Sequence, residues 1–199
     1  MEWIDHAVRG RVVGRYGRTV AVRLILGHGA SGTAASMTPF VDGLRARGID
    51  AVAIDLPKRR AEDVVPRWLE LAPPGRDVAV GGHSFGGRVA SLAAASASGA
   101  IGHLPGYRGL VCFSYPLHRP GGPELGPRVA HWPTIACPVL LLSGESDPFA
   151  RIDLLREAMT LLPDGELVTY PRLGHGLKPV LDDVLDRTAV FIAALPDRR

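Results

Sequence analysis

The sequence predicts an α/β fold in which helices cover both faces of a mostly parallel central sheet. Along the chain, short apolar runs alternate with longer segments of helical periodicity, the pattern of parallel strands joined by helical crossovers. The short runs are rich in Val, Leu and Ile and show little polar alternation, which is typical of strands buried on both faces. These two observations favour a single layered domain spanning residues 1–199.

The individual elements follow from the same pattern. The expected strands, in chain order, are Val20–Leu26, Asp50–Ile54, Val78–Val80, Gly109–Phe113, Pro138–Ser143 and Glu166–Tyr170. The expected helices are Met37–Arg47, Ala61–Leu71, Phe85–Ala97, Ile152–Leu162 and Val180–Leu195. In the last helix, apolar residues recur at three- and four-residue spacing, so that one face can pack on the sheet.

The composition is that of an ordinary globular protein, with 46% hydrophobic and 22% charged residues. A net charge of +3 gives no reason to expect nucleic acid as a partner. Arginines do gather near the start of the chain, at Arg9, Arg11, Arg15, Arg18 and Arg23. This cluster could bind phosphate, but a solvated hairpin edge is the simpler account.

The cellular setting is indicated by what the sequence lacks. No apolar run approaches the ~20 residues of a membrane helix, and the first residues lack the apolar region of a secretory signal. The two cysteines form no spaced metal or redox motif. We therefore expect a cytoplasmic protein without a membrane partner, a metal or an organic cofactor.

A candidate nucleophile lies between the strand expected at Val78–Val80 and the helix that follows it. The connecting sequence is GGHSFGG, with Ser84 at its centre. A serine at so tight a turn must adopt a strained backbone, which holds its hydroxyl clear of the sheet. Gly82 and Gly86 remove the Cβ atoms that would collide there. With 24 glycines in the chain the pattern alone could be an incidental turn, but its strand and helix context favours a nucleophile elbow.

A serine needs a base and an orienting acid, which in this fold follow it in the order acid, then histidine. Asp147 lies just after the strand expected at Pro138–Ser143, and His175 just after the strand that follows. Both positions are loops at strand carboxyl ends, so we predict Asp147 as the acid and His175 as the base. Glu145, two residues from Asp147, is a rival for the acid.

The first strand leads into a glycine-rich loop that suits an oxyanion hole. A tetrahedral intermediate needs two backbone N–H donors, one just after the nucleophile and one from this first loop. Phe85 is the first donor by position. Ala30 is the expected second donor, with Ser31 as the alternative. His28 in the same loop is interpreted as a structural turn residue.

Several segments resemble, in the same order, a family of small, lidless α/β-hydrolases related to dienelactone hydrolases, which includes a testis-expressed protein and a subunit of a chromatin acetyltransferase complex. They are Leu26–Ala30 (LGHGA), Gly82–Gly87 (GHSFGG), Tyr115–Gly121 (YPLHRPG), Gly144–Phe149 (GESDPF) and Gly174–Gly176 (GHG). The resemblance covers residues 24–195 and implies Ser84, Asp147 and His175 as a catalytic triad. Dienelactone hydrolases proper use a cysteine nucleophile, so their substrate does not carry over. The oxyanion loop also departs from the family pattern, reading HGASG instead of HGAG.

The function expected is hydrolysis of small esters or thioesters through an acyl-serine intermediate. Tyr115, Leu117 and His118 follow the strand Gly109–Phe113 and are expected to line the substrate pocket, unless they only pack on the surface. Between that strand and the next, a segment rich in proline and glycine leaves little room for a helical lid. Two alternatives remain, a non-catalytic scaffold that binds protein partners and an acyltransferase.

Overall fold

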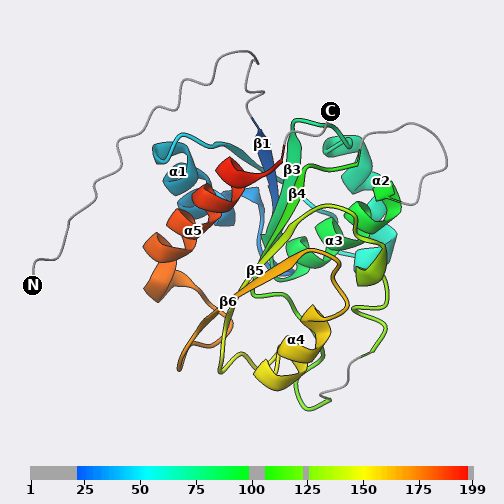
Figure 1. Ribbon diagram of the computed structural model, residues 1–199, viewed down its shortest axis with the longest axis vertical. Coiled ribbons are helices and arrows are strands. Elements are labelled where there is room, and N and C mark those ends of the chain that lie inside the picture. Colours follow the sequence, from blue (N-terminus) through cyan, green and yellow to red (C-terminus); the bar gives the residue numbers. More distant parts are fainter. Residues whose placement is uncertain (1–21, 99–105, 123–125, 197–199) are drawn as a thin grey trace, which may run out of the picture.

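The structure is a computed structural model that describes residues 22–98, 106–122 and 126–196 (Figure 1). The first two residues of the strand expected at Val20–Leu26 lie outside the described residues. The arginine cluster near the start of the chain does so as well, except for Arg23, which forms an ion pair with Asp50 at 2.8 Å.

The centre of the fold is a six-stranded sheet in which every pairing is parallel and the order is β2-β1-β3-β4-β5-β6. The strands are β1 (Arg23–Gly27), β2 (Asp50–Ile54), β3 (Val78–His83), β4 (Gly109–Phe113), β5 (Val139–Gly144) and β6 (Gly165–Tyr170). The chain moves outward from β1 to β2 and then returns to β3 on the other side of β1. In sheets of this kind ligands bind at the carboxyl ends of the strands, where the order reverses.

Helices cover both faces of this sheet (Figure 1). On one face, α1 (Thr38–Ala46) and α5 (Leu181–Ala194) pack on one apolar cluster. On the other face, α2 (Ala61–Leu71), α3 (Phe85–Ser98) and α4 (Ile152–Met159) pack on a second. Short 3-10 helices occupy residues 34–37, 132–134 and 178–180. No helix in the described ranges is long and apolar enough to cross a membrane.

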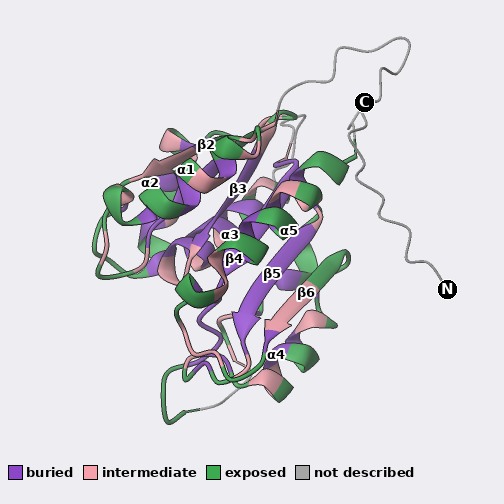
Figure 2. Cartoon of the chain, turned by 90° about the vertical axis from the view of Figure 1, so that its left-hand side faces the viewer, coloured by how far each residue is buried: buried purple, intermediate pink, exposed green. Residues whose placement is uncertain are grey.

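Burial falls from the middle of the sheet to its β6 edge (Figure 2). Every residue of β4 and β5 is buried, which explains their uninterrupted apolar sequences. In β6 only the last residue, Tyr170, is buried. The predicted fold class, with helices on both faces of a parallel sheet, is confirmed.

The helix α3 begins directly at the end of β3 and lies unusually close to β1. A Cβ atom on Gly86 would lie 2.2 Å from the carbonyl oxygen of Gly27, and one on Gly82 would lie 2.3 Å from the same oxygen. Both distances are far inside van der Waals contact, and Gly82 also has a φ of +156°. The two glycines are therefore required by the approach of the turn to β1.

The bounds of β2, α2 and β4 agree with the sequence-based expectation. The third strand is longer than predicted, because Gly81, Gly82 and His83 continue the ladder with β4. Because these three residues lack aliphatic side chains, the apolar pattern of the sequence did not indicate that the strand continues through them. Among the described residues between β4 and β5, the only helical segment is the 3-10 turn Trp132–Thr134, as expected for a fold without a helical lid.

Candidate active site

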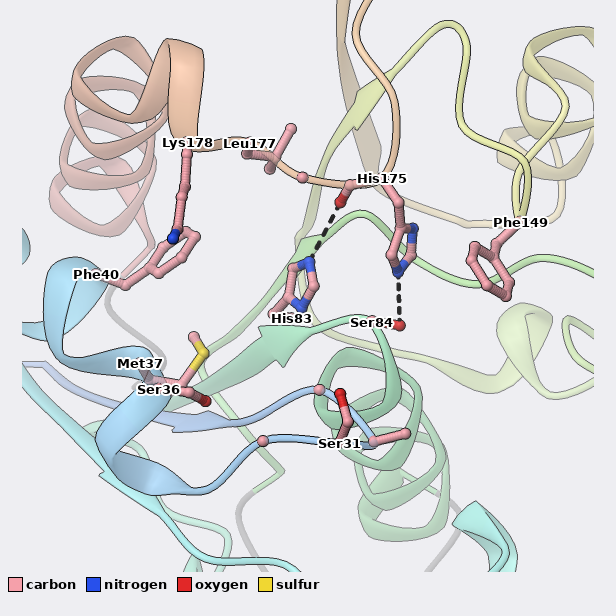
Figure 3. A pocket seen from close by; sticks show the side chains of 14 residues that line it. Ser31, Ser36, Met37, Phe40, His83, Ser84, Phe149, His175, Leu177 and Lys178 are labelled. Atoms are coloured by element: carbon pink, nitrogen blue, oxygen red, sulfur yellow. Dashed lines mark hydrogen bonds between the residues drawn. The ribbon is translucent and has the colours of Figure 1, made fainter.

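Ser84 stands at the turn between β3 and α3, with its hydroxyl in contact with His175 (Figure 3). Its φ of +51° lies in the left-handed region, which a non-glycine residue adopts at a cost of about 1–3 kcal/mol. Backbone hydrogen bonds of both the Ser84 N–H and the Ser84 carbonyl stabilise this conformation. The Ser84 N–H donates to the Phe113 carbonyl of β4 at 2.8 Å, and the Ser84 carbonyl accepts from Arg88 N–H at 3.0 Å.

Three residues predicted from separate parts of the sequence form a continuous hydrogen-bonded series. Asp147 Oδ2 lies 2.7 Å from His175 Nδ1, and His175 Nε2 lies 2.9 Å from Ser84 Oγ. Because a carboxylate can only accept, Nδ1 carries the ring proton. Nε2 is then the acceptor for the serine hydroxyl, which is the arrangement that a general base requires.

The acid of this series is fully buried, whereas its base reaches solvent. The Asp147 side chain is 0% exposed and the His175 side chain 22% exposed. A buried carboxylate requires hydrogen-bonded partners, and besides His175 the Phe149 N–H donates to Asp147 Oδ1 at 2.8 Å. The rival Glu145 is engaged elsewhere, accepting from Thr169 Oγ1 at 2.9 Å and Arg156 Nη2 at 3.2 Å.

The acid loop, residues 145–151, is fixed by its backbone. Each of its N–H groups donates to a protein acceptor, and Pro148 has none to donate. The acceptors, from Glu145 to Arg151, are Tyr170 O, Leu173 O, Gly144 O, Asp147 Oδ1, Asp147 O and His118 Nε2. In return, the His118 N–H donates to the Phe149 carbonyl at 3.0 Å.

Two rings that the sequence did not assign to the site lie against the base (Figure 3). The centroid of Phe149 is 4.6 Å from that of His175. The His83 ring is 5.2 Å from it, and His83 Nε2 lies 3.3 Å from the His175 carbonyl oxygen. Burial lowers the pKa of His83, which favours a neutral ring that donates to this carbonyl. Apart from its place next to Ser84, nothing in the sequence indicates that His83 contacts His175.

The candidate oxyanion donors come from two segments, the start of α3 and the loop after β1. Phe85 is the first residue of α3, and the first N–H groups of a helix have no acceptor within it. Ala30 and Ser31 are the central residues of a turn closed by Gly32 N–H to Gly29 O at 2.9 Å. Both line the cavity at Ser84, so the structure keeps both as candidates for the second donor.

His28 holds this turn in place. Its Nε2 accepts from Leu56 N–H at 3.0 Å, so Nδ1 is the protonated nitrogen that donates to the Gly29 carbonyl at 2.7 Å. The residue is 2% exposed. His28 is therefore a structural residue that joins the β1 loop to the β2 loop, as the sequence indicated.

A cavity of about 500 Å³ opens beside Ser84. Its wall is mainly apolar and includes side chains from three separate parts of the chain, which are Met37 with Phe40, Phe149, and Leu177. The charged Lys178 lies at its edge with these residues (Figure 3). Such a wall suits the hydrocarbon part of a small ligand.

The predicted pocket residues do not line this cavity, which corrects the expectation from the sequence. Tyr115 and Leu117 are 1% exposed and His118 6% exposed. The Tyr115 hydroxyl donates to the Arg128 carbonyl at 2.6 Å, and its ring packs edge-on against Trp132. The physical reason is that burying large side chains in the core stabilises the fold through the hydrophobic effect. Leu117 and His118 reach a different cavity, described below.

Among the residues that the structure describes, no group of three or more His, Cys, Asp or Glu side chains is placed to hold a metal ion. Both cysteines, Cys112 and Cys137, are buried and are not joined in a disulfide.

Comparison with protein families gives one clear result. A family model described as an alpha/beta hydrolase domain matches residues 20–194 of this chain. No curated protein matches the chain significantly in sequence.

The fold is shared with solved structures of low sequence identity. A monoacylglycerol lipase from Paleococcus ferrophilus superposes with a TM-score of 0.70 at 15% identity, covering 87% of this chain and 95% of that one. Est1E from Butyrivibrio proteoclasticus, solved with ferulic acid, gives 0.71 at 17% identity, covering 87% and 89%. The esterase Pf2001 from Pyrococcus furiosus gives 0.67 at 16% identity, covering 89% and 84%. At these identities the likeness supports the shared fold.

Proposed function

The chain belongs to the alpha/beta hydrolase family, and from that premise we propose that it is a serine hydrolase that cleaves small ester or thioester substrates. The observation that carries the proposal is the series Asp147–His175–Ser84, with both hydrogen bonds formed and the serine held in a strained turn. A hydroxyl in contact with a neutral imidazole, which a buried carboxylate orients, is the arrangement that activates serine.

The proposed reaction follows from this geometry. Ser84 Oγ attacks the carbonyl carbon while His175 Nε2 takes the serine proton. The tetrahedral oxyanion accepts hydrogen bonds from Phe85 N–H and from Ala30 or Ser31 N–H. His175 then returns the proton to the leaving alcohol or thiol, and the acyl group remains on Ser84. A water molecule, deprotonated by the same nitrogen, releases the acid and restores the enzyme.

Two further observations support a small acyl substrate. The cavity at Ser84 is mostly apolar, and the similar structures include proteins named as esterases and a monoacylglycerol lipase. We also propose that this chain is related to the small lidless hydrolases, because the segments given above resemble theirs. We expect water as the acyl acceptor.

Labelling by a fluorophosphonate probe tests the proposal. We expect one covalent adduct, on Ser84, because a serine activated by a base reacts far faster with the probe than an ordinary hydroxyl. The measurement is peptide mass spectrometry of the labelled protein. Ser36, which lies on the wall of the same cavity but donates to the Thr33 carbonyl, should stay unmodified.

If the folded protein forms no adduct on Ser84, the hydrolase proposal fails and the scaffold alternative gains support. Circular dichroism of the same sample shows whether the protein is folded.

A chain-length series of p-nitrophenyl esters tests the size of the substrate. We expect kcat/KM to be highest for short acyl groups and to fall toward decanoate, because the described segment between β4 and β5 provides no helical cap. An uncapped cavity of about 500 Å³ leaves part of a long chain in water and so gains little from its added apolar surface.

A rate that climbs steadily to decanoate, or jumps where the substrate begins to aggregate, would contradict the short-chain preference. The series is therefore measured below and above the solubility limit of each ester.

A further inference from the structure

A second cavity, of about 560 Å³, is lined by an unusual concentration of arginine. Among the described residues, its wall contains Arg60, Arg88, Arg119 and Arg128 and one acidic residue, Glu62. These described side chains, four guanidinium groups and one carboxylate, together carry a formal charge of +3. The remaining wall residues are apolar, glycine or proline, except for His118.

The internal pairing of this wall leaves charge uncompensated. Arg88 forms an ion pair with Glu62, and Arg60 approaches the same carboxylate only to 4.0 Å. The Arg119 guanidinium has no hydrogen-bond acceptor or ion-pair partner among the described residues. Among the described wall residues, one carboxylate therefore faces several guanidinium groups, and an anion from solution would complete the pairing.

Two of the four arginines, Arg88 and Arg128, are also held in place, whereas Arg60 and Arg119 are exposed. Arg128 Nη1 donates to the carbonyls of Pro116 at 2.8 Å and His118 at 3.2 Å. The Arg88 side chain is only 16% exposed. Burial and the nearby charges of Arg88 and Arg119 lower the pKa of Arg128, as expected where guanidinium groups face one another. The two held guanidinium groups offer a partly organised site for a carboxylate or phosphate, which the two exposed ones can approach.

One wall residue of this cavity, Arg88, is bonded through its backbone to the proposed nucleophile. Arg88 is one helical turn after Ser84 on α3, and its N–H donates to the Ser84 carbonyl. His118, on the cavity wall, also holds the acid loop through Arg151 N–H at 3.0 Å. The arginine-lined cavity therefore adjoins the two segments that carry Ser84 and Asp147.

We propose that the arginine-lined cavity binds a carboxylate or phosphate group of the substrate, so that the preferred ester is a small anionic one. The inference rests on the proposed serine hydrolase function for its catalytic part. The binding of the anion itself does not depend on catalysis, and it can be measured separately.

The first experiment measures binding in the Ser84→Ala protein, by calorimetry at low ionic strength. Inorganic phosphate and glutarate are titrated in separate arms, which distinguishes a phosphate site from a carboxylate site. We expect at least one of them to bind, and Arg128→Gln to weaken that binding about 10- to 100-fold, the range for losing a hydrogen bond to a charged group.

Three further variants control this result. Arg119→Gln should weaken binding as well, and its exposed side chain can be replaced without disturbing the backbone contacts that Arg128 makes. Glu62→Gln should strengthen binding, because it removes the carboxylate that competes for Arg88. Arg67→Gln, on α2 and paired with Glu70 in solvent, changes the net charge equally and should leave binding unchanged.

The second experiment compares the mono-p-nitrophenyl ester of glutaric acid with its methyl ester, which is the neutral form of nearly the same molecule. We expect the wild-type kcat/KM to be about tenfold or more higher for the acid, mainly through KM. Arg119→Gln should lower this ratio and Arg67→Gln should not. Ser84→Ala supplies the background rate.

The outcomes separate the two proposals. Binding that fails for both anions in the Ser84→Ala protein, or that weakens equally in Arg67→Gln and Arg119→Gln, overturns the anion site. Hydrolysis of both esters without preference for the acid overturns the proposed substrate class and leaves the hydrolase function intact. Anion binding without hydrolysis of either ester supports the site and overturns the hydrolase function.

Discussion

Replacement of either Ser84 or His175 by alanine is expected to lower kcat for ester hydrolysis by about 10⁴- to 10⁶-fold. The serine provides the bond-forming oxygen, and the histidine nitrogen 2.9 Å away accepts its proton, so neither side chain can act without the other. For the same reason the double variant should be scarcely slower than either single variant. The measurement is the steady-state rate with a p-nitrophenyl ester of short acyl chain.

Non-additivity is the decisive feature of this experiment. If the two single losses multiply in the double variant, the two side chains act independently and the proposed proton transfer is wrong. Ser36→Ala is a matched control, because it removes a hydroxyl from the wall of the same cavity that makes no contact with His175. Its effect on kcat should be far smaller.

Asp147→Asn is expected to lower kcat by roughly 10²- to 10⁴-fold, with little change in KM. The Asp147 carboxylate accepts the Nδ1 proton of His175 and so keeps Nε2 unprotonated. An amide can present an N–H group to Nδ1, which stabilises the wrong tautomer, and it carries no charge to balance the imidazolium formed during attack. The measurement is again the steady-state rate, with KM determined in parallel.

Glu145→Gln is the matched control for the acid. Its carboxylate contacts Thr169 and Arg156 rather than the base, so the rate should change little. A large loss in Glu145→Gln combined with a small loss in Asp147→Asn would show that the acid is wrongly assigned. Thermal melts of both variants distinguish a catalytic loss from unfolding, since the Asp147 side chain is buried.

The sequence was informative where backbone geometry restricts the choice of residue. The elbow needs glycine on both sides of Ser84, because Cβ atoms there would overlap the Gly27 carbonyl. A strand buried on both faces must be continuously apolar, so β4, in which every residue is buried, could be delimited from composition alone. The loops after β5 and β6 could then be identified, and with them Asp147 and His175.

The sequence was less informative where the position of a side chain depends on how residues distant in the sequence pack together. Tyr115, Leu117 and His118 follow a strand at the correct edge of the sheet, but nothing local indicates that they pack inward. His83 contacts the backbone of His175, a residue 92 positions away, and no local pattern reports such a contact. The arginine-lined cavity likewise draws on α2, α3 and the segment after β4.

The acid loop has a consequence for how the protein loses activity. Every N–H group it has is already bonded within the protein, so amide exchange with solvent requires several bonds to break together. The segment should then open as one cooperative unit, with the protection of the core rather than of a surface loop. Heating should therefore abolish catalysis together with global unfolding and not at a lower temperature.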